Sequence, residues 1–558
     1  MKFFSIIGFL LANVVFIQCG KSGGGSVQQP PTSAPANFNI TSLTIDGMSN
    51  NAIYYDVSPT PSIKFNFPTK ISRTTSNGSI ALKDNSGSNV SCNVAYENGD
   101  SSIVLVPSAP LGLLSRYLVT VSNQLRSVNG GSLVNAVQTT LQTSIDSSFK
   151  FPVISDDALL SLVQQRTFKY FWDFAHPVSG LARERNTSGD LVTSGGSGFG
   201  IMAIITGIER NFVTRAQALT RLQTIVGFLS SKAQRFKGAF PHWLNGATGA
   251  VIPFSSKDNG ADLVETSYLV QGLITARQYF NGSDPAETTL RNDINTICNE
   301  VQWNWFQKNN ENVLYWHWSP DYNWEMNHKI QGWNECLITY VLAASSANYS
   351  IPKTVYDLGW ASNGAMRNNN TYYGTSLPLG PSQGGPLFFA HYSFLGINPN
   401  SLSDSYANYA TQNRSHSLIN YSYTSANPKR FYGYSGSVWG LTASDIPNGY
   451  TASSPTNDVG VIAPTAALSS LPYTPQESMR ALKFFYYVLG DKLWKDYGFI
   501  DAFSLHELWF ADSFLAIDQG PIIIMIENYR TGLLWNLFTS APEVKSALKK
   551  LGFSATYL

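Results

Sequence analysis

The residues of this chain that could do chemistry are carboxylic acids at the starts of its most apolar segments. These acids are Asp258, Asp262, Glu265, Glu335, Asp458 and Asp518. A helix dipole stabilises a carboxylate near a helix N-terminus by about 0.3–1 kcal/mol, which is sufficient to explain Asp458. It does not explain Glu335, which follows Trp333 and Asn334 and is expected inside a buried helix, where an unpaired charge is costly. Asp262 and Glu265 are three residues apart and would share one face of a helix.

Carboxylates that converge on a sugar-sized cleft are what cleavage of a glycosidic bond requires. One carboxyl, its pKa raised by apolar walls, protonates the leaving oxygen, and the other activates water or attacks carbon. The sequence contains no HExxH, GxSxG or Walker motif, so we predict neither a metal nor a cofactor. His242, His317, His328 and His391 are expected in or beside the same loops, which leaves a lyase with a His/Tyr mechanism open.

Aromatic side chains are concentrated in the long segments between the apolar ones. Rings that are exposed in loops can stack on sugars, although any single ring is more often part of the packing. The candidate substrate-binding residues are His242, Trp243, Trp316, Trp318, Tyr322, Trp333, Tyr432 and Tyr434.

The composition narrows the class of ligand. The chain has 558 residues, 37 Lys+Arg and 36 Asp+Glu, a formal net charge of +1, and as much aromatic as charged content (13% each). A neutral chain without a basic block lacks the electrostatic footprint of a nucleic-acid-binding protein. Many rings and few charges suit neutral, hydroxyl-rich ligands such as sugars.

The first residues are typical of a targeting signal. Lys2, the apolar stretch 3–17 and Cys19 predict a signal peptide over 1–18 whose following cysteine is acylated, followed by a flexible tether over 19–36. We therefore expect a lipid anchor on Cys19 and a location in the cell envelope; the alternative is a secreted protein with an incidental cysteine. For the other cysteines, at 92, 298 and 336, the spacing favours free thiols, with a bridge between Cys298 and Cys336 as the alternative.

Residues 37–145 show short alternating segments separated by Asn-Gly and Gly-Gly turn signals. This pattern predicts a β-sandwich that resembles bacterial Ig-like domains. The expected strands are Ser42–Ile45, Ile53–Val57, Ser62–Phe67, Ser79–Leu82, Ser101–Val106, Tyr117–Val121 and Val137–Leu141.

Beyond this region the hydrophobic period becomes helical. Capping boxes are expected at Thr214, Asp284, Thr474 and Ser540, ahead of amphipathic helices. Six more apolar segments open near Gly198, Gly260, Ile330, Pro386, Asn457 and Asp518. Helices that are apolar all round are buried, so we predict an (α/α)6 toroid with these six as its inner ring. The long links precede the inner helices and therefore all lie at one end; they are expected at 175–197, 232–259, 309–329, 368–385, 414–456 and 491–517.

Four stretches carry a resemblance to a known family: residues 168–172 (FKYFW), 258–271 (DNGADLVETSYLVQ), 332–335 (GWNE) and 518–521 (DQGP). They resemble the glucoamylase-like domain family, and within it glycoside hydrolase family 144, the β-1,2-glucanases. The resemblance covers about residues 155–553 and implies a catalytic domain over 151–558. It also implies a β-1,2-glucan or sophoro-oligosaccharide substrate, hydrolysis with inversion, and no metal.

The matched motifs imply which acids form the site. Glu335 would be the general acid and Asp518 the general base, while Asp258, Asp262 and Glu265 would hold sugar hydroxyls or relay a proton. Two other functions are kept as alternatives, a polysaccharide lyase on the same toroid and a non-catalytic glycan-binding lipoprotein. The sequence leaves endo against exo action and the oligomeric state open.

Overall fold

The computed structural model describes residues 34–558, which divide into two compact units with the boundary between residues 145 and 146. The predicted signal segment 1–18, the acylated Cys19 and most of the tether lie outside the described residues. Within the described range, none of the helices combines the length and the apolar character that crossing a membrane requires.

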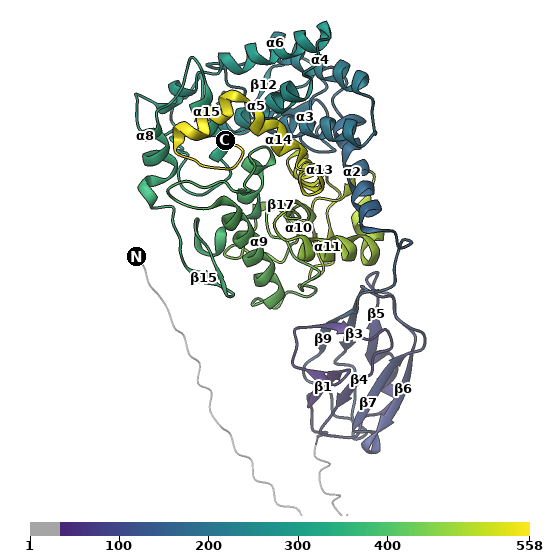
Figure 1. Ribbon diagram of the computed structural model, residues 1–558. Coiled ribbons are helices and arrows are strands. Elements are labelled where there is room, and N and C mark those ends of the chain that lie inside the picture. The colour runs from purple at the N-terminus through teal and green to yellow at the C-terminus, as the bar shows by residue number, and fades with distance from the viewer. Residues whose placement is uncertain (1–33) are drawn as a thin grey trace, which may run out of the picture. The chain divides into compact units, whose positions relative to one another are not determined.

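The N-terminal unit consists of two packed sheets (Figure 1). One has the order β2-β1-β4-β7-β6 and the other β3-β9-β8-β5; only β3 and β9 pair in parallel. All seven predicted strands are present within two residues of their expected bounds, and β2 and β6 were not predicted. The strands are β1 Ser42–Ile45, β2 Met48–Ser49, β3 Ile53–Val57, β4 Ile63–Asn66, β5 Ile80–Lys83, β6 Cys92–Glu97, β7 Ser102–Pro107, β8 Arg116–Val121 and β9 Val137–Thr143.

Hydrophobic and polar residues alternate along these strands, and their burial alternates in the same way. Ile63 and Phe65 on β4 face the inside with no exposed surface, while Lys64 and Asn66 between them are partly exposed. Such a period of two places one face of each sheet in the core. The strand β6 was not predicted, because it is an edge strand whose residues are mostly exposed.

The second unit is built mainly from helices. The longer ones are α2 Asp156–Trp172, α3 Ser194–Glu209, α4 Arg215–Ser231, α5 Leu263–Tyr279, α6 Pro285–Glu300, α7 Leu337–Ser345, α9 Tyr409–Ala426, α11 Pro475–Lys483, α13 Ala516–Arg530, α14 Leu533–Ser540 and α15 Pro542–Leu551. Shorter ones are α8 Lys353–Val355, α10 Pro464–Ser469 and α12 Gly490–Leu493.

Three of the predicted inner helices, α3, α5 and α13, are buried along almost their whole length. They lie side by side, with α2, α4 and α6 further out (Figure 1). Two glycines allow α3 and α5 to cross closely: a Cβ on Gly198 would lie 2.1 Å from the carbonyl oxygen of Tyr268, and one on Gly272 would lie 2.2 Å from that of Gly198. Neither position has room for a side chain.

The other inner segments differ from the prediction. The segment at Pro386 forms two 3₁₀ turns, η6 Leu387–Ala390 and η7 Tyr392–Leu395, rather than an α-helix, since it is rich in aromatic residues of modest helix propensity. The fifth helix, α10, begins at Pro464 instead of Asn457, because Gly460 adopts a positive φ of 79° and Pro464 occupies a first-turn position. The third, α7, begins only after Glu335.

Of the four expected capping boxes, the one at Thr214 is confirmed. Asp284 caps α6 through Ala286, because Glu287 is engaged by Arg215 instead. The prediction was wrong at Thr474, whose side chain does not cap α11, and wrong at Ser540, which is the last residue of α14. The predicted loop 414–456 was also wrong over its first part, which belongs to α9.

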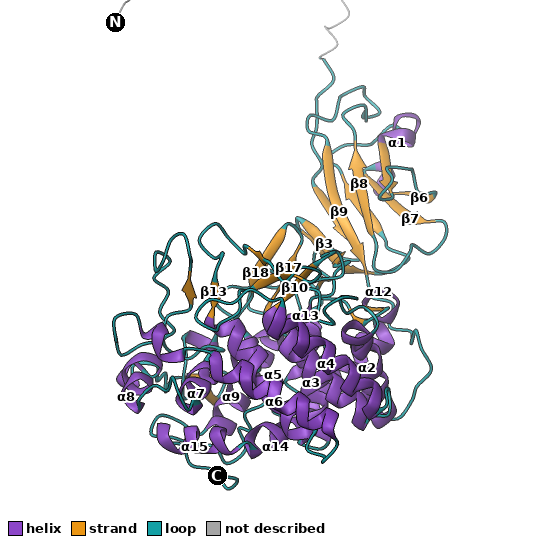
Figure 2. Ribbon diagram, turned by 90° about the horizontal axis from the view of Figure 1, so that it is seen from above, coloured by secondary structure: helices purple, strands orange, loops and turns teal. Residues whose placement is uncertain are grey.

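Short strands in the long links gather at one end of the helices. They include β10 Leu191–Thr193, β11 Trp243–Asn245, β12 Val251–Ile252, β13 Ala261–Asp262, β14 His317–Trp318, β17 Ala443–Ile446, β18 Gly449–Ala452, β21 Phe503–Ser504 and β22 Trp509–Phe510. In Figure 2, β10, β13, β17 and β18 lie on one side of the helical layer, and α14 and α15 lie on the other. The links that carry these strands lie at one end of the helices, which we call the mouth.

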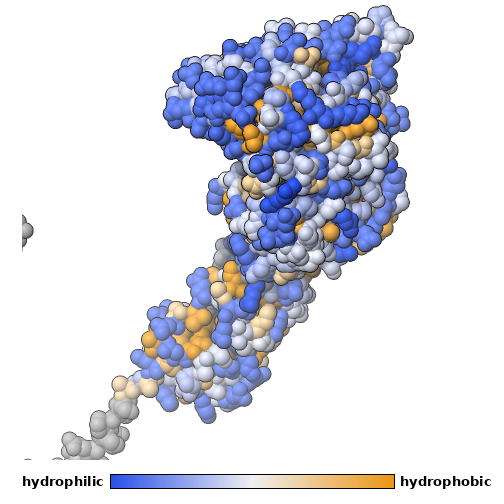
Figure 3. All heavy atoms as spheres, turned by 60° about the vertical axis from the view of Figure 1, so that its left-hand side comes forward, coloured by the Kyte–Doolittle hydropathy of each residue, from blue (hydrophilic) through white to orange (hydrophobic). Residues whose placement is uncertain are grey.

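The remaining strands are four short ones, β15 Thr371–Tyr372, β16 Thr375–Ser376, β19 Trp494–Lys495 and β20 Gly498–Phe499. On the face drawn in Figure 3, hydrophilic residues cover most of the helical unit, and hydrophobic residues reach the surface in separate patches. The cysteines at 92, 298 and 336 are free, as the sequence favoured.

Candidate active site

Three of the predicted acids lie together at the mouth with two histidines; we call Asp258, Asp262, Glu265, His242 and His317 the first acid group. Asp262 ends β13 and caps α5, where its Oδ1 accepts hydrogen bonds from the amides of Val264 and Glu265 at 3.0 and 2.9 Å. The pairing of β13 with β14 sets His317 opposite Asp262. The Nε2 of His317 lies 3.5 Å from an oxygen of Asp258 and 3.8 Å from one of Asp262.

His242 connects two members of this group. Its Nδ1 lies 3.0 Å from Asp262 Oδ2, and its Nε2 lies 4.0 Å from Glu265 Oε1. Burial disfavours charge on the imidazole, but the carboxylates of Glu265 and Asp262 prevail and raise the pKa of His242 to about 9. Burial opposes the ionisation of Asp262 as well, yet its hydrogen bond to His242 and the charge of that ring lower its pKa below the usual range. His242 and Asp262 are therefore an ion pair at neutral pH.

The other acids of the first group are held closer to neutral. Burial, followed by the charge of Asp262, raises the pKa of Asp258 to about 7. Burial also raises the pKa of Glu265, although its Oε2 accepts hydrogen bonds from the amide of Gly195 at 2.8 Å and the hydroxyl of Thr193 at 3.2 Å. Carboxyls of different protonation state thus lie next to one another.

Glu335 lies beside the first acid group, in the turn that leads into α7. Its position before the helix corrects the expectation that it lies inside one; the turn is shaped by a bond from the amide of Cys336 to Asn334 Oδ1 at 2.9 Å. Glu335 is 9% exposed, and burial together with the negative charges of Glu265 and Asp262 raises its pKa to about 7. This carboxyl can hold a proton at neutral pH at a point that solvent reaches.

Asp518 belongs to a second acid group, formed with Asp501 and Asp445. Burial and the neighbouring Asp501 raise the pKa of Asp518 well above its usual value, and burial raises that of Asp501 to about 7. Asp501 Oδ2 accepts a hydrogen bond from the amide of Asp445 at 2.7 Å, while Asp518 Oδ2 is buried without a hydrogen-bond partner in the described residues. Of the two neighbouring carboxyls, Asp518 is the one held more strongly in its neutral form.

Arg185 supplies the positive charge of the second acid group. Its Nη1 lies 3.1 Å from Asp445 Oδ2, and its Nε lies 2.9 Å from Glu184 Oε2. Ser513 donates a further hydrogen bond to Asp445 Oδ2 at 2.5 Å. Because Arg185 is paired twice inside the protein, it does not form the basic cluster that neutralises a uronate in a lyase.

The first turn of α3 lies between the two acid groups. The amide of Gly195 binds Glu265, and a Cβ on the next residue, Gly196, would lie 2.7 Å from that of Ala516, two residues before Asp518. Ser393 donates a hydrogen bond to the carbonyl oxygen of Glu335, and this contact places the neighbouring Tyr392 beside that acid.

Tyr392 is part of an aromatic floor with Phe199, Tyr268 and Phe388. The ring of Tyr392 lies 5.4 Å from that of Phe199, 5.7 Å from that of Tyr268 and 5.2 Å from that of Phe388. Burial and the negative charges of Asp518, Glu335 and Glu265 raise its pKa well above the ordinary value. Both acid groups thus act on one tyrosine at the floor.

The first acid group also has the spacing of a cation site. One nitrogen or oxygen each from His242, Asp258 and Asp262 lie within 4.8 Å of one another. However, the Nδ1 of His242 is already engaged by Asp262 Oδ2 at 3.0 Å, and Asp262 Oδ1 is taken up by the amides of α5. The donor set fits an acid–base network better than a metal.

The predicted substrate-binding aromatics divide into two sets. Trp243, Trp316, Trp318 and Tyr322 are at least partly exposed at the mouth. There, Trp316 stacks on His317 and His328 with ring centres 5.6 and 4.9 Å apart. Trp243 packs 4.8 Å from Phe254, which is half exposed and stacks on His242 at 4.3 Å.

The other predicted substrate-binding residues take part in packing or in hydrogen bonds within the protein. Trp333 is 4% exposed and packs against Phe394 and Tyr409, so its ring is in the core rather than in a sugar site. Tyr434 donates to Asp458 Oδ1 at 2.8 Å, and the amide of Tyr432 binds His506 at 3.2 Å. Asp458 lies in a loop six residues ahead of α10 and does not cap a helix.

His391 was expected at the mouth and is found in the core. It is 2% exposed, its Nε2 lies 3.0 Å from Ser470 Oγ, and burial lowers its pKa to about 3. A neutral buried imidazole bound to serine is a packing element.

Asp501, Asp445, Arg185, Phe254 and Tyr392 were not predicted. Asp501 could have been found, because an acid between Phe499-Ile500 and Ala502-Phe503 is as costly to bury as Glu335. The other four are brought to the mouth by long-range packing.

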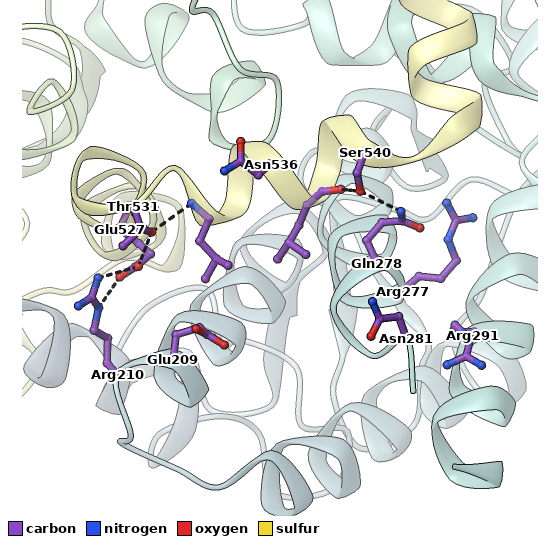
Figure 4. Close-up of a pocket in the computed structure, with 12 residues that line it drawn as sticks. Glu209, Arg210, Arg277, Gln278, Asn281, Arg291, Glu527, Thr531, Asn536 and Ser540 are labelled. Atoms are coloured by element: carbon purple, nitrogen blue, oxygen red, sulfur yellow. Dashed lines mark hydrogen bonds and ion pairs between the residues drawn. The ribbon is translucent and has the colours of Figure 1, made fainter. Parts of the chain in front are cut away.

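A hollow of about 610 Å³ lies at the opposite end of the helices, lined by residues of α3, α5, α6, α13 and α14 (Figure 4). Two of its arginines are already paired with acids: Arg210 binds both oxygens of Glu527 at 2.6 and 2.7 Å, and Arg277 pairs with Glu543 and also binds Asn295 at 2.8 Å. These pairs tie helix ends together, and no acid of the two groups lines this hollow.

Two family models match parts of this chain. A family model described as "Putative glucoamylase" matches residues 327–542, and a bacterial Ig-like domain model matches residues 38–150. The exo β-1,2-glucooligosaccharide sophorohydrolase of Parabacteroides distasonis is 46% identical over 445 residues, which cover 75% of this chain and 61% of that protein.

Two solved structures are also similar. The endo-β-1,2-glucanase of Chitinophaga pinensis, in complex with sophorotriose and glucose, is 50% identical with a TM-score of 0.71, over 73% of this chain and all of the other. The β-1,2-glucanase of Parabacteroides distasonis is 37% identical with a TM-score of 0.70, over 94% of this chain and 74% of the other. The chain therefore belongs to the glucoamylase-like family that contains the β-1,2-glucanases of glycoside hydrolase family 144, with a bacterial Ig-like domain ahead of it.

Proposed function

We propose that this protein hydrolyses β-1,2-linked glucan or sophoro-oligosaccharides. The observation that carries the proposal is Glu335, a partly accessible carboxyl with a pKa of about 7 next to the ionised Asp262. Such a carboxyl can give a proton to a leaving glycosidic oxygen at neutral pH. The substrate is inferred from the relatives, which act on β-1,2-glucan and its oligosaccharides.

In the proposed mechanism, Glu335 is the general acid and the Asp501–Asp518 pair is the general base. A base must be ionised, and within the pair Asp501 carries the negative charge while Asp518 holds the proton. Asp258, Asp262 and Glu265 hold sugar hydroxyls, and His242 keeps Asp262 ionised. Water activated by the pair on the face opposite the leaving group would invert the configuration.

For the architecture, we infer an (α/α)6 barrel. Its support is the buried set α3, α5, α7, α10 and α13, with the turns η6 and η7 in the place of the fourth inner helix. For the location, we propose anchoring in the cell envelope through lipid on Cys19. Metabolic labelling with a radioactive fatty acid tests the anchor, since Cys19→Ala should remove the label.

The activity is tested by incubating the full chain with linear β-1,2-glucan and, separately, with β-1,3-glucan. We expect release of short β-1,2-linked oligosaccharides from the first substrate alone, detected by chromatography, with reducing ends of inverted configuration in early NMR spectra. Absence of release from the β-1,2-glucan at high protein concentration would overturn the proposal. Products that absorb in the ultraviolet would instead indicate a lyase.

A further inference from the structure

Tyr450 lies on a hairpin that reaches over the second acid group. The hairpin is formed by β17 and β18, and its register sets Asp445 directly opposite Tyr450. Side chains that are directly opposite in an antiparallel pair project from the same face. Asp445 points toward Arg185 and Ser513, so Tyr450 projects on the side of the acids.

The hairpin is fixed to the carboxyl pair through its main chain. The amide of Asp445 donates to Asp501 Oδ2 at 2.7 Å, and Asp501 lies next to Asp518. The carboxylate of Asp445 is held at the same time by Arg185. Tyr450 is therefore carried on a rigid support next to Asp501 and Asp518.

Tyr450 is half exposed and lies close to the carboxyls of the second acid group. Because 50% of the residue is exposed, a ligand at the mouth can reach it. Partial burial and the charges of Asp518 and Asp501 raise the pKa of its hydroxyl well above the ordinary value, so it remains a donor. Within residues 34–558 this hydroxyl makes no hydrogen bond, whereas those of Tyr423 and Tyr434 both bind Asp458.

We propose that Tyr450 is a substrate-binding residue whose hydroxyl donates a hydrogen bond to a glucosyl hydroxyl beside Asp518 while its ring covers that sugar. The inference rests on the proposed function, because the ligand is the same glucan. A hydroxyl that only supported the hairpin would have a partner in the protein, and a phenylalanine would support the hairpin equally well.

The test compares Tyr450→Phe and Tyr450→Ala with the wild type in the full chain. The control is Tyr529→Phe at the far end of α13, where Tyr529 is 44% exposed. The substrates are β-1,2-linked glucooligosaccharides of defined length, and kcat and KM are measured separately. We expect Tyr450→Phe to raise KM about 3- to 10-fold with Tm unchanged, because one neutral hydrogen bond is lost. Tyr450→Ala should raise KM further. The control Tyr529→Phe should match the wild type.

Binding of the same oligosaccharides is also measured by calorimetry with Glu335→Gln, with and without Tyr450→Phe. A weaker affinity in the double variant, by the same factor as the rise in KM, supports the inference. If Tyr450→Phe has the same KM as the wild type and an unaltered affinity, the inference is overturned and the proposed hydrolysis still holds. If the wild-type chain showed neither turnover nor binding of these oligosaccharides, the proposed function itself would be overturned.

Discussion

The Nδ1 of His242 and the Oδ2 of Asp262 lie 3.0 Å apart and join a protonated imidazole to an ionised carboxylate at the mouth of the helices. The pKa of His242 is raised to about 9, against about 6.5 for an unfolded histidine. The resulting stability is fully present below pH 6.5 and is lost as the pH rises through 9.

The ion pair predicts that His242→Gln lowers the melting temperature near pH 6, where it removes the charge that Asp262 needs. The difference from the wild type should narrow as the pH approaches 10. Tryptophan fluorescence reports this unfolding selectively, because every tryptophan of residues 37–558 lies at or after Trp172, in the helical unit. A constant difference between pH 6 and pH 10 would contradict the assignment of charge to His242.

A second prediction concerns the pH dependence of kcat/KM. If Glu335 donates a proton, activity is present while it is protonated and falls as the pH rises through about 7. The profile on oligosaccharide should therefore show an alkaline limb near pH 7. Full activity up to pH 9 would exclude Glu335 as the general acid.

A third prediction is that Glu335→Gln lowers kcat by about 10²–10⁴-fold, the usual contribution of a general acid. The fold should be retained, since glutamine fills the same space and removes a carboxyl that burial disfavours. Thermal melts and oligosaccharide release check both statements. Glu300→Gln is the matched control, because Glu300 is exposed and forms an ion pair with Arg235, away from the two acid groups. A large loss of stability for Glu335→Gln alone would indicate a structural role.

The carboxyl pair leads to a fourth prediction. Asp501→Asn removes the more readily ionised carboxyl of the pair and should reduce kcat by about 10²-fold or more if the pair is the general base. A single-turnover assay on a substrate with an activated leaving group, which needs little help from Glu335, isolates this step. Unchanged turnover by Asp501→Asn would exclude the pair as the base.

At the other end of the helices, the pair of Arg210 and Glu527 predicts an effect on stability alone. Glu527 is 1% exposed, and removing its charge leaves Arg210 without a partner. We expect Glu527→Gln to cost about 3–5 kcal/mol of the free energy of unfolding, measured by denaturant titration, with KM unaltered at a temperature where the variant is folded. A change in KM would instead connect the hollow of Figure 4 to the mouth.

The sequence by itself determined the local elements and the type of chemistry. The alternation of Ile63 and Phe65 with polar neighbours predicted β4, and Thr214 with Gln217 predicted the start of α4, because these signals depend on residues close in the chain. The cost of burying Glu335 pointed to the general acid for the same reason: an acid among apolar residues stands out in any fold.

Only the tertiary structure decided which groups meet. Asp501 and Asp518 are 17 residues apart in the chain and interact because the chain returns to the mouth between them. Trp333 is turned into the core and Tyr450 is carried over the acids by the pairing of β17 with β18. Such contacts depend on long-range packing, and the pKa values that set the chemistry depend on burial and neighbouring charges that no local pattern contains.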